Sequence, residues 1–110
     1  MESVLDSLAE QGLQSDERYV ESYVDQRMRK GFGPRRIEAE LRERGVDDHL
    51  IHRHLDIDDE IWRELMRDVH DRKFGPAAAD GRSELGRRAR FLEYRGFTSA
   101  QVSRFLRFDD

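Results

Sequence analysis

The chain has 110 residues, of which 36% are hydrophobic and 40% are charged, and its formal net charge is −4. This length allows one modest domain or two small subdomains with a thin core, and it excludes a second large domain. The absence of cysteine excludes a disulfide framework and cysteine-ligated zinc. No apolar run approaches the roughly 20 residues of a membrane span, and the start lacks the pattern of a signal peptide. We therefore expect a folded cytoplasmic protein.

Apolar residues recur at spacings of three and four, and no useful stretch alternates with period two. The fold class predicted from this pattern is all-α. The first apolar face, formed by Val4, Leu5 and Leu8, is closed by Gly12. We interpret residues 1–14 as the remnant last helix of a preceding repeat.

Three helices are predicted next. Ser15 or Asp16 can cap a helix that ends at Gly31 with cations in its last turn. The helix after it begins at Pro34, whose missing N–H needs no partner in a first turn, and stops before the glycine at 45. Asp47 then caps a third helix that ends near residue 55.

The same succession recurs further along the chain. The segment DERY recurs as DDEIW, 43 residues later, and RKGFGP recurs as RKFGP, 43 or 42 residues later. After about nine extra residues, PAAADGRSE, the match resumes 51 residues later. Thr98 and Gln101 form a capping box on the last helix. The chain therefore divides into three-helix repeats at 15–55 and 56–110, which must pack against each other because short helices are marginal alone.

The stretch RKGFGPRRI, residues 29–37, invites comparison with a phosphate loop. It lacks the glycine spacing, the lysine position and the hydroxyl residue of a Walker motif, so we interpret it as a turn between two helices with Phe32 and its counterpart Phe74 as buried plugs. Residues 27–46 nevertheless hold seven basic and three acidic side chains. The free N–H groups at the start of helix 34–44 add to this positive corner.

Other chemistry is poorly supported. ELRERGVDDHLIHRHL resembles a helix-turn-helix, but Asp47 and Asp48 would repel phosphate where a recognition helix makes close contact. His49 and His52 lie one turn apart without a completing ligand set, and we expect them to be solvated. The acidic run 56–60 lacks the glycine of a calcium loop. No catalytic constellation is present, and the aromatic residues are expected mostly in the core.

The run DERYVESYVDQRMRKGFGPRRIEAELRERGV, a second DDEIW and RKFGP, and RFLEYRGF closely resemble the RecX family of bacterial recombination regulators. The resemblance covers about residues 8–108. It implies an elongated, curved array of tandem three-helix repeats that binds RecA and its single-stranded DNA filament and inhibits the recombinase, ATPase and SOS co-protease activities. It also implies a monomer that is not an enzyme and needs no cofactor or metal.

This chain differs from the family pattern because most of the first repeat is missing. Two rival interpretations remain open: a stand-alone nucleic-acid-binding helical module without a RecA role, and a folded chain that does not inhibit. The cationic blocks and the resemblance together predict the residues that contact RecA or DNA. These are Arg29, Lys30, Arg35, Arg36, Arg72, Lys73, Arg87, Arg88 and Arg90.

Overall fold

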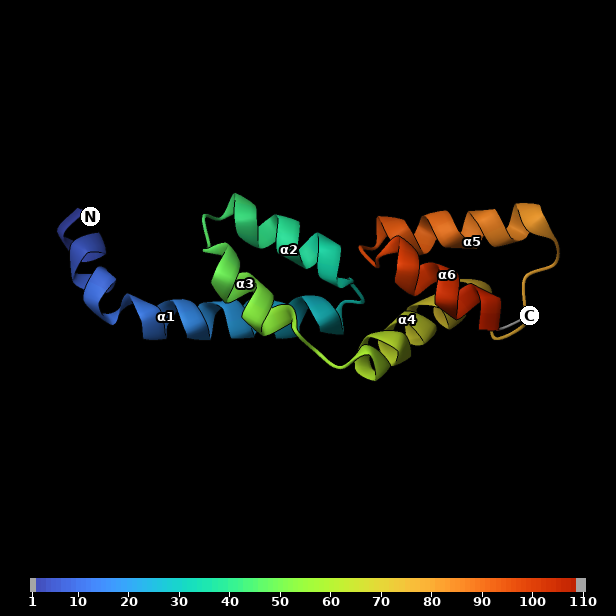
Figure 1. The fold of residues 1–110 in the computed structure, drawn as a ribbon, viewed down its shortest axis with the longest axis horizontal. Helices are drawn as coiled ribbons and strands as arrows, with labels where there is room; N and C mark the ends of the chain where they lie inside the picture. The colour runs from blue at the N-terminus through green and yellow to red at the C-terminus, as the bar shows by residue number, and fades with distance from the viewer. Residues whose placement is uncertain (1, 109–110) are drawn as a thin grey trace.

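A computed structural model describes the backbone of residues 2–108 and the side chains of residues 16–107. The described chain forms six α-helices and no strand, and it is elongated, with extents of 58 × 21 × 21 Å (Figure 1). The predicted all-α fold class is confirmed. Helices α1 to α3 occupy one half of the molecule and helices α4 to α6 the other half.

Helix α1 runs without interruption over Glu2–Arg29. The predictions that Gly12 ends a helix, and that Ser15 or Asp16 caps a new one, are therefore wrong. A single glycine inside a helix costs only about 1 kcal/mol relative to alanine, which the other residues of a long helix offset. Figure 1 shows the first part of α1 turning away from the direction of the rest. Residues 2–14 belong to the same helix as the first repeat.

The first repeat packs the second half of α1 against α2 (Pro34–Glu43) and α3 (Asp48–Leu55). Pro34 opens α2 as predicted, and the side chain of Asp47 caps α3 by accepting a hydrogen bond from the backbone N–H of His49 at 3.1 Å. One apolar stripe from each helix forms the core. Its fully buried members are Val20, Ile37, Leu41 and Ile51.

The second repeat consists of α4 (Asp59–Phe74), α5 (Arg82–Tyr94) and α6 (Ser99–Phe108). The predicted capping box before α6 is confirmed. The backbone N–H of Thr98 donates to Gln101 Oε1 at 2.8 Å, and the N–H of Gln101 donates back to Thr98 Oγ1 at 3.0 Å. The most deeply buried apolar side chains of this repeat are Trp62, Met66, Leu92, Phe97, Val102 and Phe105.

Three helices end in the same glycine motif. Gly31 has φ +87°, its N–H donates to the carbonyl of Met28 at 2.8 Å, and the N–H of Phe32 donates to the carbonyl of Arg27 at 3.1 Å. Gly45 and Gly96 end α2 and α5 with equivalent pairs of hydrogen bonds and positive φ angles. Glycine is required there because a Cβ strains the left-handed conformation.

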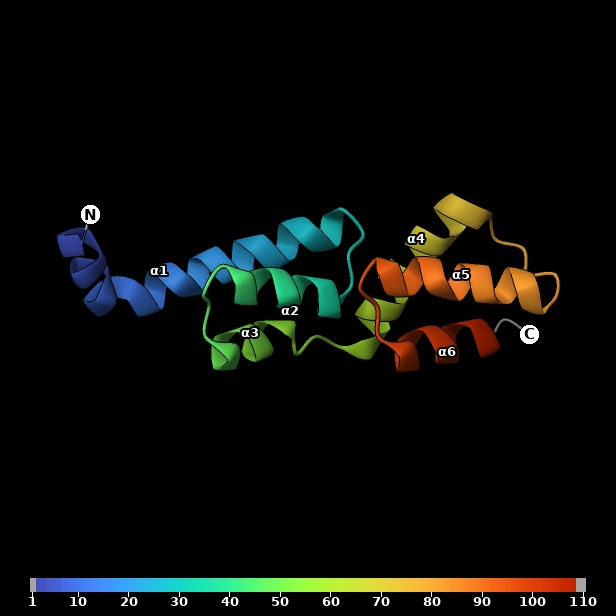
Figure 2. The same cartoon turned by 90° about the horizontal axis from the view of Figure 1, so that it is seen from above.

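The two repeats meet where α5 ends and α2 begins. The backbone N–H of Gly33 donates to the carbonyl of Arg95 at 2.9 Å, and the N–H of Arg35 donates to the carbonyl of Gly96 at 2.8 Å. The negative end of one helix dipole thus faces the positive end of another. Both helices follow the long axis of the molecule in Figure 2. We call this contact between residues 30–36 and residues 94–97 the joint.

The joint overturns one expectation. At the start of α2, which the sequence leaves free for an anion, the N–H groups of Gly33 and Arg35 are already bonded to carbonyl groups of the second repeat. The contact is also very close, because a Cβ at Gly33 would lie 2.5 Å from the carbonyl carbon of Gly96 and from the nitrogen of Phe97. The glycine-proline turn therefore serves to hold two repeats together.

Candidate nucleic-acid interface

A groove of about 270 Å³ lies beside the joint, between the ends of α1 and α4 and one face of α5. Its exposed rim carries the last basic residues of α1 and α4, and its less exposed floor carries apolar side chains and one further arginine. We call this the joint groove. It is lined by Arg29, Lys30, Gly31, Leu65, Asp68, Val69, Arg72, Lys73, Phe91 and Arg95.

The rim repeats the same pattern on its two sides. Arg29 pairs with Asp25 one turn earlier at 3.1 Å, and Arg72 pairs with Asp68 at 3.2 Å. Both arginine side chains are 78% exposed. Ion pairs at such exposed positions contribute little because water and salt screen them. Both arginines can therefore turn towards an anionic partner at small cost.

The two lysines of the rim have no carboxylate partner among the described residues. Lys30 is exposed and its ammonium group makes no hydrogen bond, ion pair or ring contact there, whereas the Lys73 ammonium lies 5.5 Å from the centroid of the Phe91 ring. An exposed cation over an aromatic ring gains only about 0.5–1 kcal/mol. The sequence predicted all four rim cations as contact residues, and the structure brings them into one groove.

Arg95 is the groove residue that the sequence analysis missed. Its guanidinium lies 4.3 Å from the centroid of Phe32, Nε donates to the carbonyl of Gly31 at 3.2 Å, and Nη2 donates to the carbonyl of Lys30. Burial, followed by repulsion from Arg36 and Arg27, lowers the pKa of Arg95 below its usual range. Its position 51 residues after Arg44 was the available signal.

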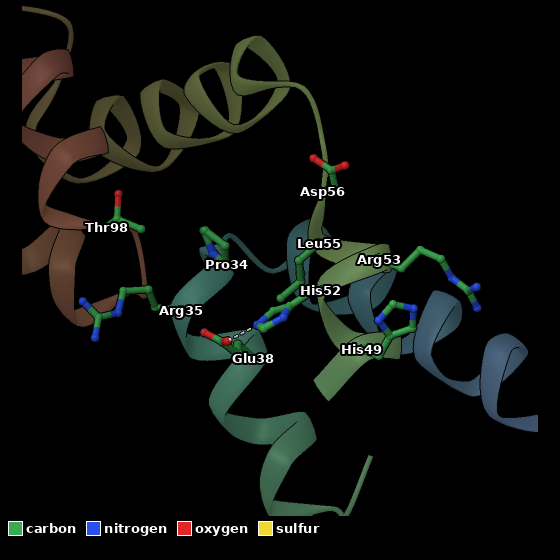
Figure 3. Close-up of a pocket in the computed structure, with 9 residues that line it drawn as sticks. All are labelled: Pro34, Arg35, Glu38, His49, His52, Arg53, Leu55, Asp56 and Thr98. Atoms are coloured by element: carbon green, nitrogen blue, oxygen red, sulfur yellow. Dashed lines mark hydrogen bonds and ion pairs between the residues drawn. The ribbon is translucent and has the colours of Figure 1, made fainter. Parts of the chain in front are cut away.

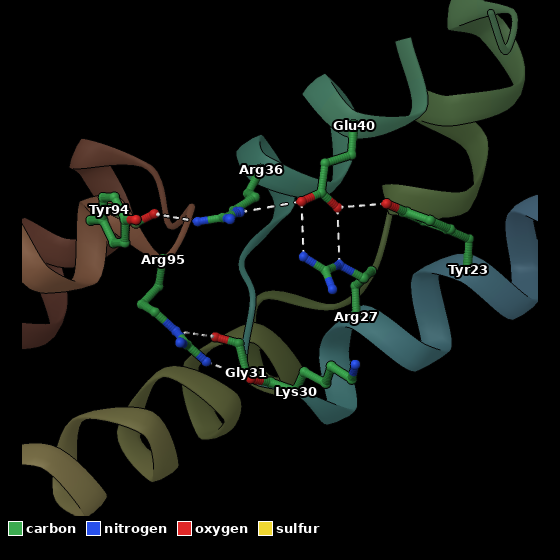
Figure 4. A network of polar contacts seen from close by, with 8 residues as sticks. All are labelled: Tyr23, Arg27, Lys30, Gly31, Arg36, Glu40, Tyr94 and Arg95. Atoms are coloured by element: carbon green, nitrogen blue, oxygen red, sulfur yellow. Dashed lines mark hydrogen bonds and ion pairs between the residues drawn. The ribbon is translucent and has the colours of Figure 1, made fainter. Parts of the chain in front are cut away.

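Next to the joint groove, three guanidinium groups surround the Phe32 ring. Figure 4 shows the three arginines and their hydrogen-bond partners. Arg27 and Arg36 lie 4.1 and 4.5 Å from its centroid, in addition to Arg95. Phe32 and Phe74 are half-buried rather than buried, so the expectation of two buried plugs is met only in part. The flat face of the ring instead serves as a base for stacked arginines.

Glu40 neutralises part of this charge. It accepts hydrogen bonds from Arg27 at 2.9 Å through both carboxylate oxygens, from Arg36 at 3.2 Å and from the Tyr23 hydroxyl at 2.8 Å. Burial opposes ionisation, but the hydrogen bonds from these three side chains outweigh it and lower the pKa of Glu40. Arg36 also donates to the carbonyl of Tyr94 at 3.5 Å, so this predicted contact residue is engaged inside the molecule.

The second predicted cluster, Arg87, Arg88 and Arg90, contains one buried and two exposed arginines. Arg88 is only 5% exposed and donates hydrogen bonds to Glu84, to His70 Nε2 at 3.1 Å and to the carbonyl of Ala77 at 2.8 Å. It therefore holds α5 against α4 and cannot meet a partner without leaving these bonds. Arg87 is exposed and pairs with Glu84 at 3.0 Å, and Arg90 is exposed. Neither lines the joint groove.

A second, wider hollow of about 560 Å³ lies between α2, α3 and the start of α6 (Figure 3). Arg35 lines it together with the histidines at positions 49 and 52, but Glu38 and Asp56 face the same space. His52 Nε2 lies 2.8 Å from a carboxylate oxygen of Glu38. This mixed charge suits an anion less well than the joint groove does.

The remaining expectations have mixed outcomes. His49 and His52 are exposed, as predicted, and Trp62 and Phe105 are buried core residues. Tyr19 is 44% exposed and is an exception to the expectation that the aromatic residues lie mostly in the core. Within the described residues, no group of three or more histidine or acidic side chains could hold a metal ion. No helix in that part of the chain is long and apolar enough to cross a membrane.

Tandem three-helix units joined end to end define a helical repeat protein, and the positively charged groove at their junction is its candidate binding surface. Comparison with known proteins gives the family. Residues 15–55 match the second three-helix domain of RecX, and residues 59–106 match the third. The chain belongs to the RecX family of regulatory proteins.

Individual relatives agree. The chain is 46% identical over 110 residues to the regulatory protein RecX of Pseudomonas fluorescens, covering 96% of this chain and 68% of that protein. It is 42% identical to the RecX protein of Pseudomonas syringae, with the same coverage of both chains. For the RecX protein of Halorhodospira halophila the identity is 43%, covering 90% of this chain and 62% of the relative. The chain thus spans about two thirds of these relatives.

Proposed function

We propose that this chain regulates the RecA recombinase by binding RecA and its single-stranded DNA filament, and that it inhibits the recombinase, ATPase and SOS co-protease activities. It acts as a cytoplasmic monomer, without a cofactor and without catalysis of its own. The observation that carries the proposal is the joint groove, which combines cations of both repeats on a member of a family of regulatory proteins.

The charge pattern supports an elongated contact with an anionic partner. The exposed cations of the joint groove lie near the middle of a chain 58 Å long, and an acidic segment lies on each side of residues 27–46 in the sequence. Arg35, Arg87 and Arg90 remain proposed contact residues outside the groove. Arg36 and Arg88 leave the proposed set because their guanidinium groups are engaged within the protein.

The test measures RecA ATPase activity and RecA-stimulated repressor cleavage on single-stranded DNA with increasing amounts of this chain. We expect inhibition below one chain per RecA. The double variant Lys30→Gln/Lys73→Gln should weaken inhibition, whereas Arg18→Gln/Arg107→Gln, which removes two exposed cations away from the groove, should inhibit like the wild type. Absence of inhibition by the wild type at a severalfold excess over RecA would refute the proposal.

The alternative is a stand-alone helical module that binds nucleic acid without any role towards RecA. The donor-rich joint groove favours this function as much as it favours the first. It predicts oligonucleotide binding without an effect on either RecA activity. A salt titration separates a phosphate contact from a protein contact, because each phosphate contacted on a single strand contributes about 0.7 to the slope of log affinity against log salt.

A further inference from the structure

We propose that the joint groove binds single-stranded nucleic acid, with phosphate groups on its cationic rim and one unstacked base against the ring of Phe91. This inference rests on the proposed function, because it names the ligand and its pose at the same site. It assigns a binding role to Phe91, one of the aromatic residues that the sequence predicts to lie mostly in the core.

The groove offers hydrogen-bond donors and almost no free acceptors. Lys30 and Lys73 on the rim and Arg95 on the floor can only donate, and the carboxylate of Asp68 is engaged by Arg72. The carbonyl groups of residues 30 and 31 accept hydrogen bonds from Arg95. A phosphate group is made only of acceptors and fits this set, whereas a peptide segment would bring N–H groups that find no partner.

The floor of the groove is apolar. Leu65 and Phe91 are half-buried and Val69 is buried, so the groove has an apolar floor below its cationic rim. The Phe91 ring packs edge-on against Phe74, with ring centroids 5.4 Å apart and an interplanar angle of 89°. The exposed Lys73 ammonium lies 5.5 Å from the centroid of Phe91, and Phe91 is itself only half-buried and lines the groove, so part of the ring is open to it.

A nucleic-acid base can take the place of that ammonium. Aromatic rings bind bases by stacking irrespective of sequence, and the displaced lysine then lies next to the phosphate of the same nucleotide. A duplex keeps its bases stacked inside and would touch only the rim. The combination of an aromatic floor and a cationic rim therefore selects a single strand.

The decisive experiment compares the full chain and three variants on oligothymidylate, on the same oligonucleotide with abasic sites, and on duplex DNA at fixed salt. Phe91→Leu should bind the single strand about tenfold more weakly than the wild type. It should bind the duplex and the abasic strand like the wild type. Phe91→Tyr should retain single-strand affinity, and Lys30→Gln/Lys73→Gln should weaken binding to all three ligands.

Abasic substitution also probes the contact without altering the protein. It should weaken binding by the wild type about tenfold and leave Phe91→Leu unchanged. Equal affinity of the wild type for oligothymidylate and for the abasic strand would overturn the inference. It would also be overturned if the lysine variant bound oligonucleotides like the wild type but lost affinity for DNA-free RecA. Neither result bears on inhibition of RecA by the wild type, so failure of this inference is distinguishable from failure of the proposed function.

Discussion

Replacing Gly33 by alanine should uncouple the two repeats. The φ of Gly33 is −89°, which any residue can adopt, so the substitution strains no backbone torsion of its own. The added Cβ would lie 2.5 Å from two backbone atoms of residues 96 and 97, and the joint must open to admit it. Opening breaks the two backbone hydrogen bonds of the joint. At about 0.5–1.5 kcal/mol each, their loss weakens the coupling between repeats by about 1–3 kcal/mol.

Urea unfolding followed by two signals measures this coupling. The single tryptophan, Trp62, reports on the second repeat, and circular dichroism reports on all helices. The two transitions should coincide in the wild type and separate in Gly33→Ala. Gly33→Ser adds a hydroxyl that can cap α2 but also adds the same Cβ, so this variant should behave like Gly33→Ala. Gly86→Ala, whose Cβ meets only an arginine nitrogen at 3.5 Å, should leave the transitions coincident. Coincident transitions at the wild-type midpoint in Gly33→Ala would refute the reasoning.

Three further outcomes are expected. Arg88→Met should lower the free energy of unfolding by about 2 kcal/mol, measured by urea titration, because the partners of a nearly buried guanidinium lose their donor. The pKa of Glu40 in the folded protein lies below the usual 4.5, so the stabilisation it provides is complete above pH 4.5 and is lost as the pH falls through the folded pKa. Glu40→Gln should therefore reduce the loss of unfolding free energy at acid pH, measured by urea unfolding across pH. The N–H of Arg35 should exchange with deuterium more slowly in NMR than that of Ser83, the equivalent first-turn position of α5, because only Arg35 donates across the joint.

The helix boundaries that depend on local chemistry could be predicted from the sequence. Pro34 at a first turn, glycine after the last turn and the Thr98–Gln101 capping box act over a few residues, and each is confirmed. The uninterrupted α1 could not be predicted, because helix propensity at Gly12 and Ser15 competes with the rest of a long helix, and the sequence shows only the local signals.

The four rim cations of the joint groove could be predicted from the sequence, but their arrangement in space could not. The two basic pairs at the ends of α1 and α4 were evident as a repeat, but their meeting in one groove depends on how α5 docks on α2. The same docking engages Arg36 and brings in Arg95 across 64 residues of sequence. The sequence could not distinguish Arg88 from Arg87, because burial of one and exposure of the other follow from the packing of α5 on α4.

The connection between α4 and α5 lies at the end of the second repeat away from the joint (Figure 1). This is where the second repeat carries its roughly nine additional residues. Gly75 and Gly81 bound the connection with positive φ angles, and a Cβ at either would meet no atom within 4 Å. The second repeat is thus fixed by the joint at one end only, so a fluorophore or a tether attached at residues 78–80, clear of the Ala77 carbonyl that Arg88 binds, would leave the alignment of the repeats and the joint groove undisturbed.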